Sequence, residues 1–149
     1  KLKRWTFDLN GDSSNYKVEQ LDDSICEFPR LDERFSGLIY RHGYIACAGD
    51  QPPKSGGYSA LGHIDHQTGK ISKYDMGGNL ATSEPIFVPA KTDSPEGQGY
   101  LLSVVYDITK DKSHLIILDA ENISDGPIGR AYLDHRVPFG FHGNWKSAH

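Results

Sequence analysis

Short apolar strands bounded by turn residues recur along almost the whole chain, and helical periodicity is nearly absent. The apolar runs are rich in Tyr, Val, Ile and Leu, as is typical of strands that face a sheet core. Glycines (16) and prolines (8) are spread between them, which favours many short strands joined by turns. The pattern predicts an all-β chain, with strands at 4–9, 37–48, 59–64, 70–75, 100–106, 114–118 and 129–133.

Two polar segments are predicted to be tight turns between neighbouring strands. Residues 65–69 (Asp-His-Gln-Thr-Gly) end in a glycine, which tolerates the positive φ that such turns often require. Residues 107–112 connect two apolar runs in a similar way. Both turns predict antiparallel hairpins.

A weak internal repeat consists of an apolar strand that ends in aspartate, a polar turn and another strand. It occurs at Asp8, Asp65 and Asp119, at intervals of roughly 55 residues, close to the period of a propeller blade. We interpret this as antiparallel four-stranded blades of a β-propeller, with about three blades in this chain. A closed propeller has roughly four to eight blades, so the ring would be incomplete. The alternative is a self-contained antiparallel sandwich of similar strand number.

Composition excludes several classes of protein. The net charge of −4 provides no basic stripe to neutralise nucleic-acid phosphates. No apolar run approaches the ~20 residues that span a bilayer, and no secretory signal begins the chain. Cys26 and Cys47 form no metal-binding spacing. Two buried thiols in a reducing, cytoplasmic location are favoured, although a single disulfide stays possible. The start at Lys1 suggests an internal cut in a longer protein.

One histidine, His142, has an unusual local setting near the end of the chain. The segment 138–145 (Pro-Phe-Gly-Phe-His-Gly-Asn-Trp) surrounds it with glycines and aromatic residues. Glycine allows unusual backbone dihedrals and close approach to another group. Neutral imidazole is the commonest metal ligand in proteins, and aromatic walls control solvent access. We interpret His142 as a candidate iron ligand, against the alternative of a structural or surface histidine.

Two glutamates stand directly before proline-containing apolar segments. Glu84 precedes Pro85 and the apolar residues 86–88, and Glu27 precedes Phe28-Pro29. A carboxylate beside a buried strand is costly unless it is paired. One interpretation is that each carboxylate accepts the distal N–H of a metal-bound histidine and so fixes its tautomer. The other is a glutamate on an edge strand that faces solvent.

The remaining motifs support little further chemistry. His63 and His66 are predicted to be hairpin residues, because neighbours at this spacing in a strand do not share a face. Nucleophilic catalysis is disfavoured, since there is no Gly-x-Ser-x-Gly, and no phosphate loop or dinucleotide fingerprint occurs. Four more histidines have no supporting context: His42, His114, His135 and His149.

Several ordered motifs together resemble the C-terminal third of the carotenoid cleavage oxygenase family, which also includes lignostilbene dioxygenases and a retinoid isomerase. The resemblance extends from Arg4 to Trp145, nearly the whole chain. One departure, Glu-Gly-Gln-Gly-Tyr at 96–100, falls in a predicted surface turn. The motifs that carry the resemblance are Glu-Phe-Pro-Arg-Leu-Asp-Glu-Arg at 27–34, Ser-Glu-Pro-Ile-Phe-Val-Pro at 83–89, Leu-Asp-Ala at 118–120 and Val-Pro-Phe-Gly-Phe-His-Gly at 137–143.

The resemblance implies a seven-bladed propeller with a non-haem Fe(II) on its axis, held by four histidines from different blades. By motif, His142 would be the last iron ligand, with Glu27 and Glu84 as the carboxylates behind the ligand histidines. Residues 1–149 would be the C-terminal portion of a single propeller domain, and the other three ligands would lie in its missing N-terminal blades. This portion alone is expected to be inactive.

The implied activity is a dioxygenase that cleaves a conjugated alkene, whether a carotenoid, an apocarotenoid or a stilbene, with O₂ into two carbonyl products. An extended apolar substrate would enter along aromatic walls, to which Phe139 and Phe141 either contribute or instead pack in the core. A stilbene-type substrate is weakly favoured, and membrane contact stays open. The alternative function is a non-catalytic propeller that binds a partner through its loops.

Overall fold

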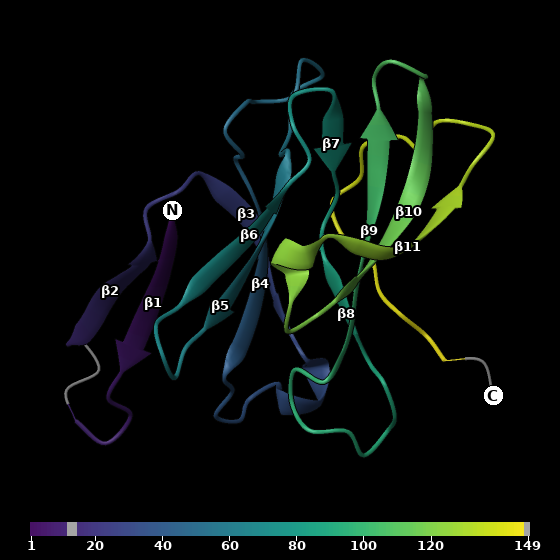
Figure 1. The fold of residues 1–149 in the computed structure, drawn as a ribbon. Helices are drawn as coiled ribbons and strands as arrows, with labels where there is room; N and C mark the ends of the chain where they lie inside the picture. Colours follow the sequence, from purple (N-terminus) through teal and green to yellow (C-terminus); the bar gives the residue numbers. More distant parts are fainter. Residues whose placement is uncertain (12–14, 148–149) are drawn as a thin grey trace.

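The computed structural model describes residues 1–11 and 15–147, and it consists of three antiparallel β-sheets (Figure 1). Short 3-10 helices, η1 (Glu33–Phe35) and η2 (Ile123–Asp125), lie in two of the connections. No helix in the described ranges is long and apolar enough to cross a bilayer. The strands are β1 (Leu2–Phe7), β2 (Tyr16–Asp22), β3 (Cys26–Leu31), β4 (His42–Cys47), β5 (Ala60–Asp65), β6 (Ile71–Asp75), β7 (Leu80–Thr82), β8 (Ile86–Pro89), β9 (Gly99–Asp107), β10 (Lys112–Asp119) and β11 (Pro127–Tyr132).

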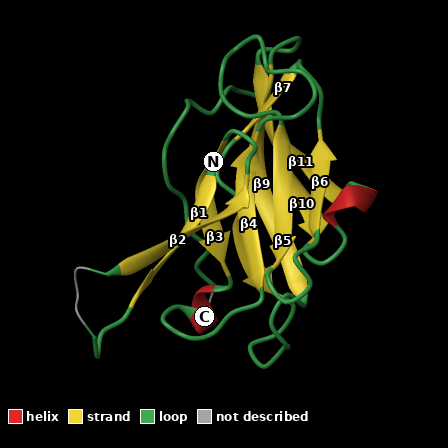
Figure 2. Ribbon diagram, turned by 90° about the vertical axis from the view of Figure 1, so that its left-hand side faces the viewer, coloured by secondary structure: helices red, strands yellow, loops and turns green. Residues whose placement is uncertain are grey.

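The sheet order is that of successive propeller blades. One sheet runs β3-β4-β5-β6. The next sheet runs β11-β10-β9, and both β7 and β8 pair with β9, one after the other along its length. The third sheet contains only β1 and β2. Figure 2 shows the larger sheets layered against each other. The all-β, antiparallel prediction is confirmed, with two full blades and a two-stranded sheet in place of a third.

The repeated aspartates occupy the same structural position. Asp8, Asp65 and Asp119 each stand at the end of a strand that pairs with the next strand along the chain. Each side chain accepts a hydrogen bond from the backbone N–H two residues later, at 3.0, 2.9 and 2.9 Å respectively. This local bond favours a turn over continued extension. The repeat therefore marks the third strand of each blade, and β1–β2 corresponds to the outer half of a blade.

The seven strands predicted from the apolar runs are all present, whereas β2, β3 and β7 are missed and β8 corresponds to the apolar residues 86–88 noted after Glu84. Strand β2 exposes most of its side chains in this chain, so it lacks an apolar pattern. Strand β3 contains Pro29, which cannot donate to a ladder and therefore argues against a strand. Both predicted turns are confirmed, with Gly69 at φ 72° in the first.

The main core lies between the two full blades. Leu101 of β9 is fully buried and pairs with Phe87 on one side and Leu118 on the other. Tyr44 and Leu61 contribute from the neighbouring blade. A smaller cluster on the opposite face of that blade contains Ile45, Cys47, Ala60 and Ile64. The blades are thus held together mainly by apolar burial.

Cys26 and Cys47 are directly opposite each other on β3 and β4, and both are free thiols. The Ala48 N–H donates to the Ile25 carbonyl at 2.9 Å, so the cysteines form a non-hydrogen-bonded pair, whose side chains approach closely. Burial raises the pKa of Cys47 to about 11. Both thiols pack as small apolar groups in the smaller cluster.

Candidate metal centre

His142 and Glu84, which are far apart in sequence, meet in the structure. The His142 Nδ1–H donates to Glu84 Oε1 at 3.1 Å, and the Gly143 N–H donates to Glu84 Oε2 at 2.9 Å. The Glu84 side chain is 3% exposed, whereas the imidazole is 75% exposed in this chain. A carboxylate that accepts at Nδ1 fixes the tautomer in which Nε2 carries the free lone pair. The contact therefore leaves the Nε2 lone pair of a largely exposed imidazole free to bind a metal ion.

Backbone irregularities place the residues around this pair. Between β7 and β8 the pairing with β9 slips by one residue, and Glu84 lies in that interruption. A second bulge in β3 falls between Glu27 and Arg30 and contains Phe28, whose φ is 53°. Such bulges redirect side chains and are common beside functional sites. The Phe28 ring meets the His142 ring edge-on, with centroids 5.9 Å apart.

Electrostatics keep the buried carboxylate of Glu84 ionised. Burial alone would raise its pKa. The Gly143 N–H, the His142 ring and the Arg30 guanidinium oppose that effect and together hold the Glu84 pKa below its usual value. An ionised carboxylate can only accept hydrogen bonds, so the proton of the contact lies on the imidazole.

The other residues predicted from this region behave differently. Glu27 is exposed on β3, and its side chain makes no hydrogen bond within the described part of the chain. Neither Gly140 nor Gly143 has a positive φ, so the expectation that these glycines give His142 an unusual backbone is wrong. Gly143 contributes backbone groups, its N–H to Glu84 and its carbonyl to Arg30, and any residue but proline has both.

The aromatic ring beside His142 comes from β3 and not from the residues that flank His142 in sequence. Phe139 instead packs edge-on against Tyr106, beside the Arg136 guanidinium. Phe141 is largely exposed in this chain. Phe28 is the aromatic residue in contact with the imidazole, and the sequence signal for it was the Glu-Phe-Pro-Arg motif.

A neutral imidazole oriented by a buried carboxylate fits a metal ligand. Across residues 1–11 and 15–147, no three histidine, cysteine, aspartate or glutamate side chains gather closely enough to hold an ion. This chain therefore offers one oriented ligand rather than a complete coordination sphere. The assignments of His142, Glu84 and Glu27 to an iron site stay predictions.

The sequence did not predict that two histidines, His42 and His63, pair with each other. His42 Nδ1 and His63 Nε2 are 2.8 Å apart in a buried contact, and His63 also stacks on Tyr44. Burial, and then the proximity of His42, lower the pKa of His63 to about 4. The signal was the β4–β5 register, which spacing along the chain does not reveal. His66 instead bonds to Arg4 from the hairpin, and His149 lies outside the described residues.

Comparison with known proteins identifies the family. The family model of the retinal pigment epithelial membrane protein matches residues 1–147. The chain belongs to this family. Lignostilbene-α,β-dioxygenase isozyme III of Sphingomonas paucimobilis is 41% identical over 99% of the chain. Isoeugenol monooxygenase of Pseudomonas putida is 36% identical over the same share. The resemblance to carotenoid and stilbene oxygenases is confirmed.

Solved structures of family members share the fold. The lignostilbene dioxygenase of Pseudomonas brassicacearum superposes with a TM-score of 0.90 at 31% identity, over 98% of this chain and 32% of that one. A cobalt-substituted apocarotenoid oxygenase of Synechocystis gives 0.84 at 27% identity, over 97% and 30%. The chain also spans 32% of the length of both curated relatives. It therefore corresponds to about a third of each of these proteins.

Proposed function

We propose that this chain is the C-terminal portion of a non-haem Fe(II) dioxygenase that cleaves a conjugated alkene with O₂ into two carbonyl products. The observation that carries the proposal is the contact between exposed His142 and buried Glu84. Within a family that includes lignostilbene dioxygenase and isoeugenol monooxygenase, that contact gives the chain one oriented imidazole.

In this proposal His142 would hold the iron through Nε2. Bound Fe(II), with open coordination positions, would supply the chemistry that activates O₂. Glu84 keeps the imidazole in one tautomer and raises its basicity through the Nδ1 contact. The Phe28 ring meets the imidazole edge-on and gives it a second contact besides Glu84. The chain's contribution at this position is the orientation of the imidazole.

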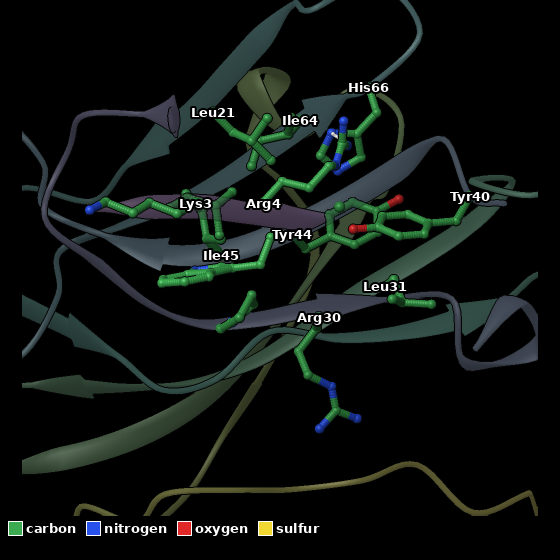
Figure 3. Close-up of a pocket in the computed structure, with 14 residues that line it drawn as sticks. Lys3, Arg4, Leu21, Arg30, Leu31, Tyr40, Tyr44, Ile45, Ile64 and His66 are labelled. Carbon is green, nitrogen blue, oxygen red and sulfur yellow. Dashed lines mark hydrogen bonds between the residues drawn. The ribbon is translucent and has the colours of Figure 1, made fainter. Parts of the chain in front are cut away.

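The remaining ligands would come from outside this chain, on the N-terminal blades of the same propeller. A cavity of about 370 Å³ lies between β1 and the β3–β4 pair, beside the two-stranded sheet (Figure 3). The rings of Trp5 and Tyr16 contact each other on β1–β2 with centroids 5.0 Å apart and are about half exposed, as expected for a surface that further strands cover. In the complete ring, Glu27 would hold a histidine from another blade.

The proposed substrate is an extended, apolar and conjugated alkene. Relatives named for lignostilbene, isoeugenol and apocarotenoid fit this class. We place the protein in the cytoplasm, where Cys26 and Cys47 would persist as free thiols.

Oxygen labelling of the products tests the proposed reaction. The full-length protein, loaded anaerobically with Fe(II), would be offered a hydroxylated stilbene and an apocarotenoid under ¹⁸O₂, and aldehydes would be reduced at once to prevent exchange with water. A dioxygenase places ¹⁸O in both products. Label in only one product would indicate a monooxygenase, and no cleavage with either substrate would favour a binding propeller.

A further inference from the structure

Arg30 of β3 lies where three segments of the chain meet at the candidate metal centre. Its Nη1 is 3.3 Å from Glu84 Oε1 and donates to the Gly143 carbonyl at 3.4 Å. Its Nη2 pairs with Glu33 on the other side. In Figure 3 the Arg30 side chain points away from the cavity residues. One guanidinium thus contacts both the carboxylate that orients His142 and the peptide that follows His142.

Arg30 supplies the positive charge that the buried Glu84 carboxylate needs. The Glu84 carboxylate is 3% exposed, and an ionised group at that depth is costly without an opposite charge. His142 is neutral when it acts as a metal ligand, and the Gly143 amide is a dipole rather than a charge. Within the described ranges, Arg30 is the lysine or arginine side chain that forms an ion pair with Glu84.

We propose that Arg30 is a positioning residue of the metal centre. Its Nη1 contacts both Glu84 and the Gly143 carbonyl, while Nη2 of the same rigid, planar fork is anchored to Glu33. The guanidinium thus fixes Glu84 relative to the Gly143 peptide, and the His142 ring between them presents Nε2 in one direction. This inference rests on the proposed function, which assigns His142 to the metal. It gives Arg30 a role through Glu84, without contact to the metal or the substrate.

Two substitutions separate this role from general stability. Lysine at position 30 keeps the charge but has a single nitrogen, so it cannot stay anchored to Glu33 while it contacts Glu84 and the Gly143 carbonyl, as the two nitrogens of the fork do. Arg34 provides the matched control, since it pairs with Asp32, which is 2% exposed, and donates to the Thr92 carbonyl at 2.8 Å. The Arg34 ion pair is therefore a comparable buried interaction that does not involve Glu84.

The first measurement is amide hydrogen exchange on the full-length protein without metal. In Arg30→Gln, the peptide that contains Gly143 should exchange about tenfold faster, because Glu84 Oε2, which accepts that N–H, is no longer held. Arg30→Lys should give a smaller increase. Arg34→Gln should leave this peptide unchanged while lowering the melting temperature.

The second measurement is the Co(II) dissociation constant and visible absorption spectrum of the same variants, with a competing chelator. Arg30→Gln should weaken Co(II) binding about tenfold, within the usual range for outer residues of metal sites, and alter the spectrum. In a Glu84→Gln background, Arg30→Gln should weaken Co(II) binding little further, because both substitutions disrupt the same contact. Arg34→Gln should bind Co(II) as the wild type does.

The two measurements give distinguishable failures. Wild-type exchange and wild-type Co(II) affinity in Arg30→Gln would overturn the role of Arg30 while leaving the metal site intact. If Arg30→Gln exchanges faster but the wild-type protein binds no metal, the positioning contact stands and the proposed function is refuted. If Arg30→Gln does not fold, Arg30→Lys decides. Wild-type exchange and a wild-type Co(II) spectrum in Arg30→Lys would overturn the claim that the guanidinium fork positions Glu84.

Discussion

Alanine in place of His142 in the full-length protein should abolish alkene cleavage and weaken Fe(II) binding by more than about 100-fold, beyond the loss typical of outer residues. The variant removes the imidazole that Glu84 orients. Folding should be little affected, since the ring is 75% exposed in this chain and packs mainly against the edge of Phe28. Turnover and Fe(II) competition with a chelator would measure the two effects.

The matched control for this prediction is His135→Ala. His135 lies on the same C-terminal segment, and its exposed ring pairs with Asp134 rather than with a buried carboxylate. We expect wild-type iron affinity and turnover in this control. Equal losses in both variants would mean that the segment, and not the ligand, is what matters. Full activity in His142→Ala would remove His142 from the site altogether.

Leu101→Ala should lower the free energy of unfolding by about 2–5 kcal/mol, the usual cost of emptying a leucine site in a packed core. Leu101 is fully buried between the paired residues Phe87 and Leu118, so the surrounding strands cannot easily collapse into the space. Equilibrium urea unfolding of the full-length protein, followed by tryptophan fluorescence, would measure the change.

Leu9→Ala is the control for the core prediction, because Leu9 is 91% exposed in this chain. Its free energy of unfolding should change by no more than about 0.5 kcal/mol, as for most surface substitutions. A cost below about 1 kcal/mol for Leu101→Ala would contradict a tightly packed interface between the two blades.

The fold was largely predictable because its signals are local. The turn at Asp65 forms from its own neighbours, as do the turns at Asp8 and Asp119, so spacing along the chain reveals the blade period. Strand β3 was hidden because Pro29 breaks its ladder, and the bulge there is what presents Phe28. The irregular feature that obscured the strand is thus part of the site.

The site was only partly predictable, since its contacts join distant segments. Motif resemblance singled out His142 and Glu84, and the structure brings this pair together. No pattern in the sequence indicated that Arg30 also contacts Glu84, because an isolated arginine in a motif is equally typical of a solvated surface. The flanking glycines suggested unusual backbone dihedrals at His142, whereas neither has a positive φ, and Gly143 contributes its N–H to Glu84 and its carbonyl to Arg30.

The central claim is that the complete protein holds iron through His142. The most direct test is metal analysis of the full-length wild-type protein after anaerobic loading with Fe(II) and removal of the excess. The account predicts about one iron per chain, as expected for a single site of nitrogen ligands with open positions. No retained iron would contradict it and leave a propeller that binds a partner or ligand without catalysis.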